Sequence, residues 1–364
     1  MSDIAVPGSG ALRAAGTVPA ADGAVGGATG TALSLRRALQ LGLAGVWLVD
    51  ALLQYQQFMF TKAFGQMLAE GAPGNPGFLA RPITWDATLV EQHAVLLNAI
   101  FATVQLLLGL GIAFRPTVRI ALGASIAWSL AVWWLGEGLG GVLNGTANPL
   151  TGAPGAVIIY ALLAVVLWPR SGDSASGDSV AGTFGKTGAA GTRVARALWS
   201  VLWLSFAYFA LLPANRAPQG TQSAIAANVG GEPAWLAAIE RNAASLTAHQ
   251  GLAISIVFAV AYVVIGVGAW LPRRYRKATL ILALVVSAMI WVVGEAFGMI
   301  LAGGATDANS GPLLALLALA FWPVRSPAGA RNSRARDSRA RDSRARDSQV
   351  RDNDEMTVLE GNDR

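Results

Sequence analysis

The sequence contains no cysteine, only two histidines and few charged residues, and each shortage excludes a class of function. Without cysteine the chain can form no disulfide, thiolate nucleophile, cysteine zinc site or cysteine-held iron–sulfur cluster. Charged residues make up 13% of the 364 residues and hydrophobic residues 54%, and the mean hydropathy is +0.48. Because a soluble domain carries about 25% charged residues, this composition predicts a membrane protein and excludes a water-soluble enzyme.

Apolar stretches recur along the chain, several of them close to the length of about 20 residues that crosses a bilayer core of roughly 30 Å. They predict an all-α, polytopic transmembrane helical bundle of eight helices. The expected spans are approximately Leu39–Phe60, Ala94–Phe114, Val118–Leu143, Ala156–Trp168, Leu198–Leu212, Gly251–Trp270, Ala278–Leu301 and Leu313–Trp322. The fourth, fifth and eighth are short, so we expect each to extend into its flanking turn.

Lysine and arginine are distributed unevenly around the predicted spans. If the N-terminus is cytoplasmic, only Lys62, Arg81, Arg216 and Arg241 of the 27 basic residues lie outside. The positive-inside rule therefore predicts a multi-pass plasma membrane protein with both termini in the cytoplasm. The basic net charge needs no nucleic-acid partner to explain it.

The two halves of the apolar region repeat each other at an offset of about 156 to 158 residues. The matching pairs are Pro76 and Pro233, His93 and His249, Trp133 and Trp291, Glu137 and Glu295, and Pro154 and Pro312. Because each half has four spans, an even number, both copies insert in the same orientation. The pattern predicts two parallel four-helix repeats related by an axis along the membrane normal.

This organisation divides the chain into five segments. They are a disordered cytoplasmic head (1–35), the first four-helix repeat (36–169), a flexible cytoplasmic linker (170–196), the second repeat (197–323) and a disordered tail (324–364). The tail repeats an Arg-Asp-Ser-Arg-Ala pentapeptide that can form no apolar face. It is expected to be a solvated polyampholyte, or else to place its arginines against anionic lipid headgroups or to leave its serines open to phosphorylation.

Four ionisable residues occupy matching positions in the two halves. His93 and His249 precede an apolar span, and Glu137 and Glu295 lie near the end of the following one. Counted from the basic turns at 1.5 Å per residue, all four are predicted near the outer face of the membrane. A carboxylate at membrane depth predicts a functional site.

The glutamates are flanked by glycine pairs that bear on how the helices pack. Gly136 and Gly140, and likewise Gly294 and Gly298, have the GxxxG spacing that puts two glycines on one helix face. Such a face lets a second helix backbone approach closely, so the glutamates are predicted beside a helix–helix contact rather than facing lipid.

Three interpretations of the four ionisable residues stay open. Imidazole and carboxylate suit a metal ion, or a proton relay between His93, His249, Glu137 and Glu295. A b-type haem could lie between the two histidines. Alternatively, the histidines are interfacial and the glutamates cap or bridge helices without any ligand. The corresponding functions are binding or transport of a small ligand, a haem- or quinone-linked redox subunit, and a structural or partner-binding membrane protein.

Polar residues are concentrated in the first half. The candidates for a ligand pocket or polar pathway there are Asp50, Gln54, Gln56, Gln57, Asn98 and Gln105. Their aligned positions in the second half are apolar, among them Ile254 and Ala261. Hydrogen bonds between helices explain the same pattern without a pathway. In the outer loops, a proline and a following aromatic residue (Pro76 and Pro233) predict a short amphipathic helix on the membrane surface.

Several segments carry a resemblance to known membrane proteins, over about Leu39 to Pro323. They are Gln54 to Phe60, Trp133 to Gly140, Gly152 to Gly155 and Trp291 to Gly298. With the Ala- and Gly-rich composition, they resemble a family of polytopic membrane proteins of high-GC actinobacteria. This resemblance implies the fold and no particular activity. The number of spans is also similar to the four-helix units of the DoxX group, which implies quinone and thiol redox chemistry.

Overall fold

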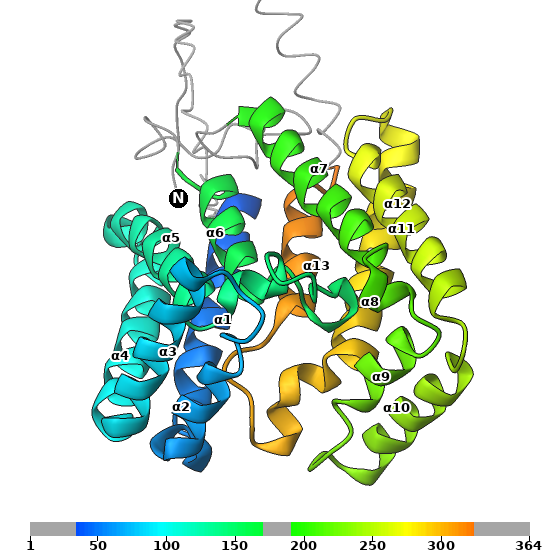
Figure 1. Cartoon of the computed structure of the whole chain (residues 1–364). Coiled ribbons are helices and arrows are strands. Elements are labelled where there is room, and N and C mark those ends of the chain that lie inside the picture. Colours follow the sequence, from blue (N-terminus) through cyan, green and yellow to red (C-terminus); the bar gives the residue numbers. More distant parts are fainter. Residues whose placement is uncertain (1–33, 170–190, 324–364) are drawn as a thin grey trace, which may run out of the picture. The chain divides into compact units, whose positions relative to one another are not determined.

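The computed structural model describes residues 34–169 and 191–323, and its regular structure in these ranges is entirely helical (Figure 1). The first range holds α1 (Leu35–Leu53), α2 (Lys62–Ala69), α3 (Gly77–Gln92), α4 (Ala94–Ala113), α5 (Val118–Leu135) and α6 (Ala156–Val166). The second holds α7 (Gly191–Ala210), α8 (Pro213–Arg216), α9 (Gly220–Ala226), α10 (Ala234–Leu246), α11 (Gly251–Gly268), α12 (Arg273–Met289) and α13 (Ser310–Ala320).

Shorter helical turns join these helices. They are η1 (Gln57–Phe60), η2 (Arg115–Thr117), η3 (Gly138–Gly141), η4 (Pro149–Thr151), the π-helical turn η5 (Ile290–Gly294) and η6 (Ala296–Ala302). The predicted disordered head and tail and most of the predicted linker lie outside the described residues. The linker was predicted to reach residue 196, but α7 already begins at Gly191.

Four helical stretches are long and apolar enough to cross a membrane. They are Ala94–Ala113, Arg115–Leu135, Gly251–Gly268 and Arg273–Gly294. α6 and α13 are apolar but have only 11 residues each, about 16 Å, which is roughly half of a bilayer core. α13 begins at Ser310, three residues before its predicted span, as expected, whereas α6 does not extend beyond Ala156. The preceding Asn309 and Gly155 have positive φ angles, which stop each helix there.

The long helices expose their apolar side chains and bury polar ones. On α11, Val257 and Val260 are 66% and 59% exposed, whereas Ser255 and Tyr262 are buried. On α4, Leu107 is 61% exposed, and Asn98 and Gln105 face inward. A soluble helix has the opposite arrangement, so these outer faces are the kind that lipid covers.

The second half therefore has more buried polarity than the sequence predicted. The buried positions of α4 recur on α11 at an offset of 157, which pairs Asn98 with Ser255 and Gln105 with Tyr262. The predicted partners Ile254 and Ala261 lie one position earlier on the helix and are only partly buried.

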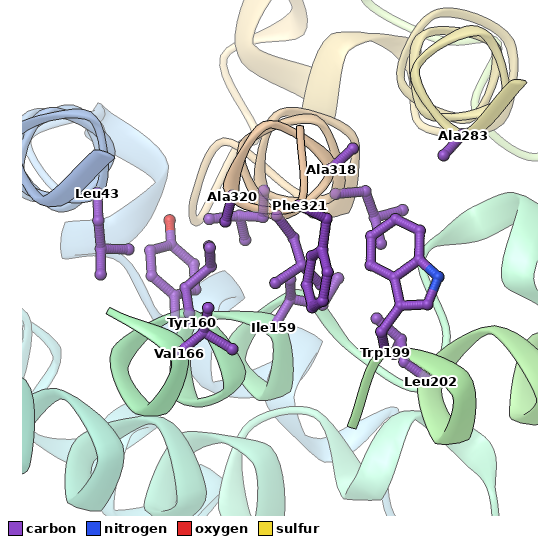
Figure 2. Close-up of a cluster of buried hydrophobic side chains, with 14 of the residues drawn as sticks. Leu43, Ile159, Tyr160, Val166, Trp199, Leu202, Ala283, Ala318, Ala320 and Phe321 are labelled. Carbon is purple, nitrogen blue, oxygen red and sulfur yellow. The ribbon is translucent and has the colours of Figure 1, made fainter. Parts of the chain in front are cut away.

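The helices pack around α6 and α13, which contact each other. α1, α4, α5 and α6 pack in sequence, and α7, α11, α12 and α13 do the same. Across the halves, α1 contacts α13 and α6 contacts α7. Figure 2 shows the resulting core, in which Ile159 and Tyr160 of α6 meet Phe321, Trp199 of α7 and Leu43 of α1.

The ends of α5 and α12 differ from the predicted spans. α5 ends at Leu135 rather than near residue 143, because Gly138, Leu139 and Gly140 adopt positive φ angles. α12 gives way at Met289 to η5, and positive φ angles at Phe297, Gly298 and Met299 turn the chain again.

The glycine pairs therefore do not lie on one helix face, and the predicted GxxxG helix contact is wrong. Gly136 caps α5, and Gly140 and Gly298 lie beyond the helix ends. Gly140 and Gly294 still allow another backbone segment to approach closely, but that segment belongs to a loop and not to a second helix. A Cβ on Gly140 would overlap the Pro154 carbonyl oxygen, and one on Gly294 would overlap that of Leu150.

Helices are present at both positions where the proline pattern predicted them. α3 begins directly after Pro76 and α10 directly after Pro233, as expected where proline fixes the residue before a helix. Trp85 on α3 and Trp235 on α10 are 63% and 53% exposed.

Candidate functional site: a buried carboxylate centre

Glu137 and Glu295 each lie at the N-terminus of a short inner helix. Glu295 is 3% exposed; its Oε1 accepts hydrogen bonds from Ser310 N at 3.2 Å and from the Ser310 hydroxyl. Its Oε2 accepts one from Gly311 N at 3.1 Å. Glu137 Oε1 accepts one from Val157 N at 3.4 Å. Because the first N–H groups of a helix are unpaired and carry the positive end of its dipole, each glutamate stabilises the start of α6 or α13.

The tryptophan one turn before each glutamate holds the chain that leads into the inner helix. Trp133 Nε1 donates to the Pro154 carbonyl at 2.5 Å, and Trp291 Nε1 donates to the Ala308 carbonyl at 3.1 Å. Pro154 thus has the same role as Ala308. The predicted match of Pro154 with Pro312 does not hold here, since Pro312 lies inside α13.

Asp50 joins α1 to both inner helices. It is fully buried; its Oδ1 accepts a hydrogen bond from Ala308 N at 3.0 Å, and its Oδ2 accepts one from the Tyr160 hydroxyl of α6. The Tyr160 ring packs on Trp47 with a centroid distance of 4.2 Å, and Trp47 Nε1 donates to Ser125 Oγ at 3.1 Å. One face of α1 is thereby fixed to α5, α6 and the segment before α13.

Asp307 is a fourth acidic residue of this region, and the sequence analysis missed it. Its Oδ1 accepts a hydrogen bond from Asn309 N at 2.6 Å, and its Oδ2 accepts one from Thr306 Oγ1 at 2.9 Å. It directly precedes Ala308, whose N–H binds Asp50, and lies three residues before Ser310, whose N–H binds Glu295. The available signal was its place just before the N-cap of an apolar helix. We call Asp50, Glu137, Glu295 and Asp307 the carboxylate centre.

The carboxylate centre has no basic partner in the described parts of the chain. Its members accept hydrogen bonds from backbone N–H groups and from the Tyr160, Thr306 and Ser310 hydroxyls, and none from a lysine or arginine of residues 34–169 and 191–323. Glu137 Oε2 is buried and has no hydrogen-bond partner there either. Burying a carboxylate without compensation costs several kcal/mol. The chemistry that fits such a group is uptake of protons.

The predicted histidines are not part of this centre. His93 lies between α3 and α4 and His249 between α10 and α11, and both are exposed. His249 Nδ1 lies 3.4 Å from Gln219 Nε2, and neither histidine is a hydrogen-bond partner of the glutamates. Within the described ranges, no three His, Asp or Glu side chains are grouped to hold a metal ion.

Of Gln54, Gln57 and Gln105, all predicted as site residues, only Gln54 contacts the carboxylate centre's loop. Gln54 is buried and donates through Nε2 to the Thr306 carbonyl at 3.0 Å, so it holds the loop that carries Asp307. Gln57 lies exposed on η1. Gln105 is buried on α4, and its Oε1 has no partner among the described residues.

Two titratable groups with a raised pKa lie on α3 and α10, outside the four candidate membrane spans. Burial, with a smaller effect of the neighbouring Glu232 carboxylate, raises the pKa of Glu240 on α10 to about 7. Burial also raises the pKa of Asp86 on α3. Both carboxyls therefore hold a proton at a higher pH than an exposed side chain does.

Comparison of the chain with protein-family models, with curated proteins and with solved structures finds no match. The class of protein is thus defined by the structure itself. It is an all-helical protein in which four helices are long and apolar enough to cross a membrane.

Proposed function

We propose that the chain is a multi-pass plasma membrane protein of two parallel four-helix repeats, α1, α4, α5 and α6 followed by α7, α11, α12 and α13. Each helix contact within the first set has a counterpart in the second, and the contact of α1 with α13 corresponds to that of α6 with α7. Equivalent roles for Glu137 and Glu295, and for Trp133 and Trp291, support the same relationship.

Basic residues support an orientation with both termini in the cytoplasm. The Arg37 guanidinium donates to the carbonyls of Ile112 (2.9 Å) and Ala113 at the C-terminal end of α4, and Arg276 donates to the Leu271 carbonyl at 3.0 Å. Cations at helix C-termini are favourable, and the positive-inside rule places them on the cytoplasmic side. On that side, the arginine-rich tail would contact anionic lipid headgroups.

The protein binds protons at the carboxylate centre, and this protonation accompanies movement of a small ligand across the bilayer. The observation that carries this proposal is the set of four acidic side chains gathered at the starts of the two inner helices, with no basic hydrogen-bond partner in the described ranges. Asp50 lies ten residues beyond Gln40 on α1, about 15 Å deeper in the bundle. Inner helices that start at membrane depth, with their N-termini at an ion-binding site, are a recurring design of transporters.

The path from the carboxylate centre to the cytoplasm is closed in this conformation. On the buried face of α1, Leu43 and Ala44 separate Gln40 from Trp47, and both are almost fully buried. Transport therefore requires a second conformation in which this apolar contact opens.

Proton flux into liposomes tests the proposal. The full chain is reconstituted around a trapped pH-sensitive dye, and a pH step is applied outside. Wild-type protein should dissipate the gradient faster than empty liposomes, and Asp50→Asn and Asp307→Asn should reduce the rate at least tenfold. Glu91→Gln, at a half-buried carboxyl near the end of α3, is the matched control and should change nothing. A wild-type rate equal to that of empty liposomes would show that protons do not cross through this protein.

A second candidate function is that of a structural or partner-binding membrane protein. The hydrogen bonds of Glu137 and Glu295 to the starts of α6 and α13 favour it, because they use the carboxylates as helix caps without a ligand. This alternative predicts that Glu295→Gln lowers thermal stability. It also predicts that wild-type protein, Asp50→Asn and Asp307→Asn all give the same proton flux as empty liposomes.

A further inference from the structure

A cavity of about 590 Å³ opens between the two halves beside α8 and α9, two helices that are labelled in Figure 1. One wall is the segment around η4 of the first half, with Asn148 and Thr151, and the other is formed by α8, α9 and Asn228 of the second half. Its volume lies within the range of roughly 300–1,000 Å³ that is usual for small-molecule sites. A site between repeats is also where transporters place their ligands.

The residues that line this cavity carry neither charge nor aromatic rings. The polar ones are Asn, Gln, Thr and Ser, and the others are Ala, with one Gly. A charged ligand would gain no ion pair there. The lining instead offers several neutral donors and acceptors next to a small apolar surface. That combination fits a molecule with many hydroxyl groups and an apolar C–H face.

Three amide side chains of the cavity are held in place by the backbone. Asn148 Oδ1 accepts a hydrogen bond from Leu150 N at 3.0 Å. Asn215 Nδ2 donates to the Ala147 and Phe209 carbonyls at 2.9 and 2.8 Å. The donor of Asn148 and the acceptor of Asn215 take part in no hydrogen bond between described residues.

The third amide, Asn228, donates through Nδ2 to the Gly294 carbonyl at 2.5 Å, and its acceptor takes part in no hydrogen bond between described residues. Each of the three amides thus has one end fixed and the other available. Such preorganisation lowers the entropy lost on binding. Since a hydroxyl can both donate and accept, it matches a mixed set of free amide donors and acceptors.

We propose that this cavity is a binding site for a small neutral polyhydroxylated molecule, of the size of a monosaccharide. The proposal does not rest on the proposed function, because no carboxyl group lines the cavity and binding can be measured without any proton flux. The cavity does border the carboxylate centre: Thr151 precedes Gly152, whose Cβ position lies 2.8 Å from Glu295 Oε1.

Calorimetric binding to the full chain in lipid nanodiscs tests the site, because maltoside detergents carry a polyol headgroup of their own. The probes are glucose, inositol and glycerol, with glucosamine and glucuronate as charged counterparts of glucose. At least one neutral probe should bind saturably, and the charged sugars should bind at least tenfold more weakly than glucose. Absence of saturable binding for all three neutral probes, or equal binding of the charged sugars, overturns the proposal.

Two neighbouring positions on α9 locate the site. Ala224 lines the cavity, whereas the exposed Ala226 points elsewhere on the same helix. Ala224→Trp should abolish binding, and Ala226→Trp should leave it unchanged. The nearly isosteric Thr151→Val, which removes one hydroxyl from the opposite wall, should weaken binding about fivefold, as expected for one hydrogen bond. Unchanged binding in both Ala224→Trp and Thr151→Val would place the ligand elsewhere and refute the proposal.

Discussion

Gly155 lies directly against the Glu137 side chain, and its substitution by alanine measures how closely the two pack. A Cβ on Gly155 would overlap Glu137 Oε2, and the φ angle of Gly155 is +119°. The backbone conformation alone costs an alanine about 1–3 kcal/mol. Overlap in a packed interior adds about 1–3 kcal/mol. Gly155→Ala should therefore destabilise the protein by about 2–6 kcal/mol.

Gly145 provides the matched control, because it also has a positive φ angle, +77°, but nothing lies within 4 Å of its Cβ position. Gly145→Ala should cost only the conformational part, about 1–2 kcal/mol. In a Glu137→Ala background the overlap disappears. Gly155→Ala should then cost about 1–3 kcal/mol less than in wild type, which a double-mutant cycle isolates.

Unfolding in mixed micelles, followed through the fluorescence of the 12 tryptophans, supplies these free energies. The reasoning fails if Gly155→Ala costs no more than Gly145→Ala. It also fails if the cost of Gly155→Ala is the same with and without the Glu137 side chain, since the carboxylate then does not reach the start of α6.

Three further predictions concern different parts of the molecule. The Glu240 carboxyl has a pKa raised to about 7, so it stabilises the fold at low pH and this stability is lost as pH rises from its ordinary value of 4.5 through 7. Unfolding free energies should fall by up to about 1.4 kcal/mol per pH unit in that window, and Glu240→Gln should flatten the dependence. Val257→Arg on the outer face of α11 should cost about 2.5–3.5 kcal/mol on membrane insertion and lower the membrane-bound fraction in fractionated cells, whereas Val257→Ala should not. Tyr160→Phe removes the donor to Asp50 Oδ2, which leaves the buried Asp50 with the Ala308 N–H alone, and should cost about 1–3 kcal/mol, against less than about 0.5 kcal/mol for Tyr208→Phe on the exposed surface, both measured by unfolding.

Hydropathy predicted the long helices well and their ends poorly. α4 and α11 coincide with the expected spans because their apolar runs stop at basic turns. α5 was expected to continue through Gly138 to Gly140, since these residues do not interrupt an apolar run. Their positive φ angles depend on contacts with loops far away in the sequence, which composition cannot reveal.

The candidate site was predictable in part. Glu137 and Glu295 stood out as carboxylates at membrane depth, and Asp50 and Gln54 as polar residues within an apolar span. Asp307 gave only a weak signal, its place just before the N-cap of an apolar helix, because an acidic residue in a loop is ordinary. Only the fold brings it beside Ala308, whose N–H binds Asp50. The histidines gave a strong signal through their matching positions, yet both are exposed.

The central claim is that the carboxylate centre binds protons, and infrared spectroscopy observes such protons directly. The full chain is titrated in lipid while the carbonyl stretch of protonated carboxyl groups is recorded. A Glu240→Gln background removes the carboxyl on α10 whose pKa is raised to about 7. The band should grow as the pH is lowered, and part of it should be absent in Asp50→Asn and in Asp307→Asn. A titration in which neither variant changes the band would contradict the account.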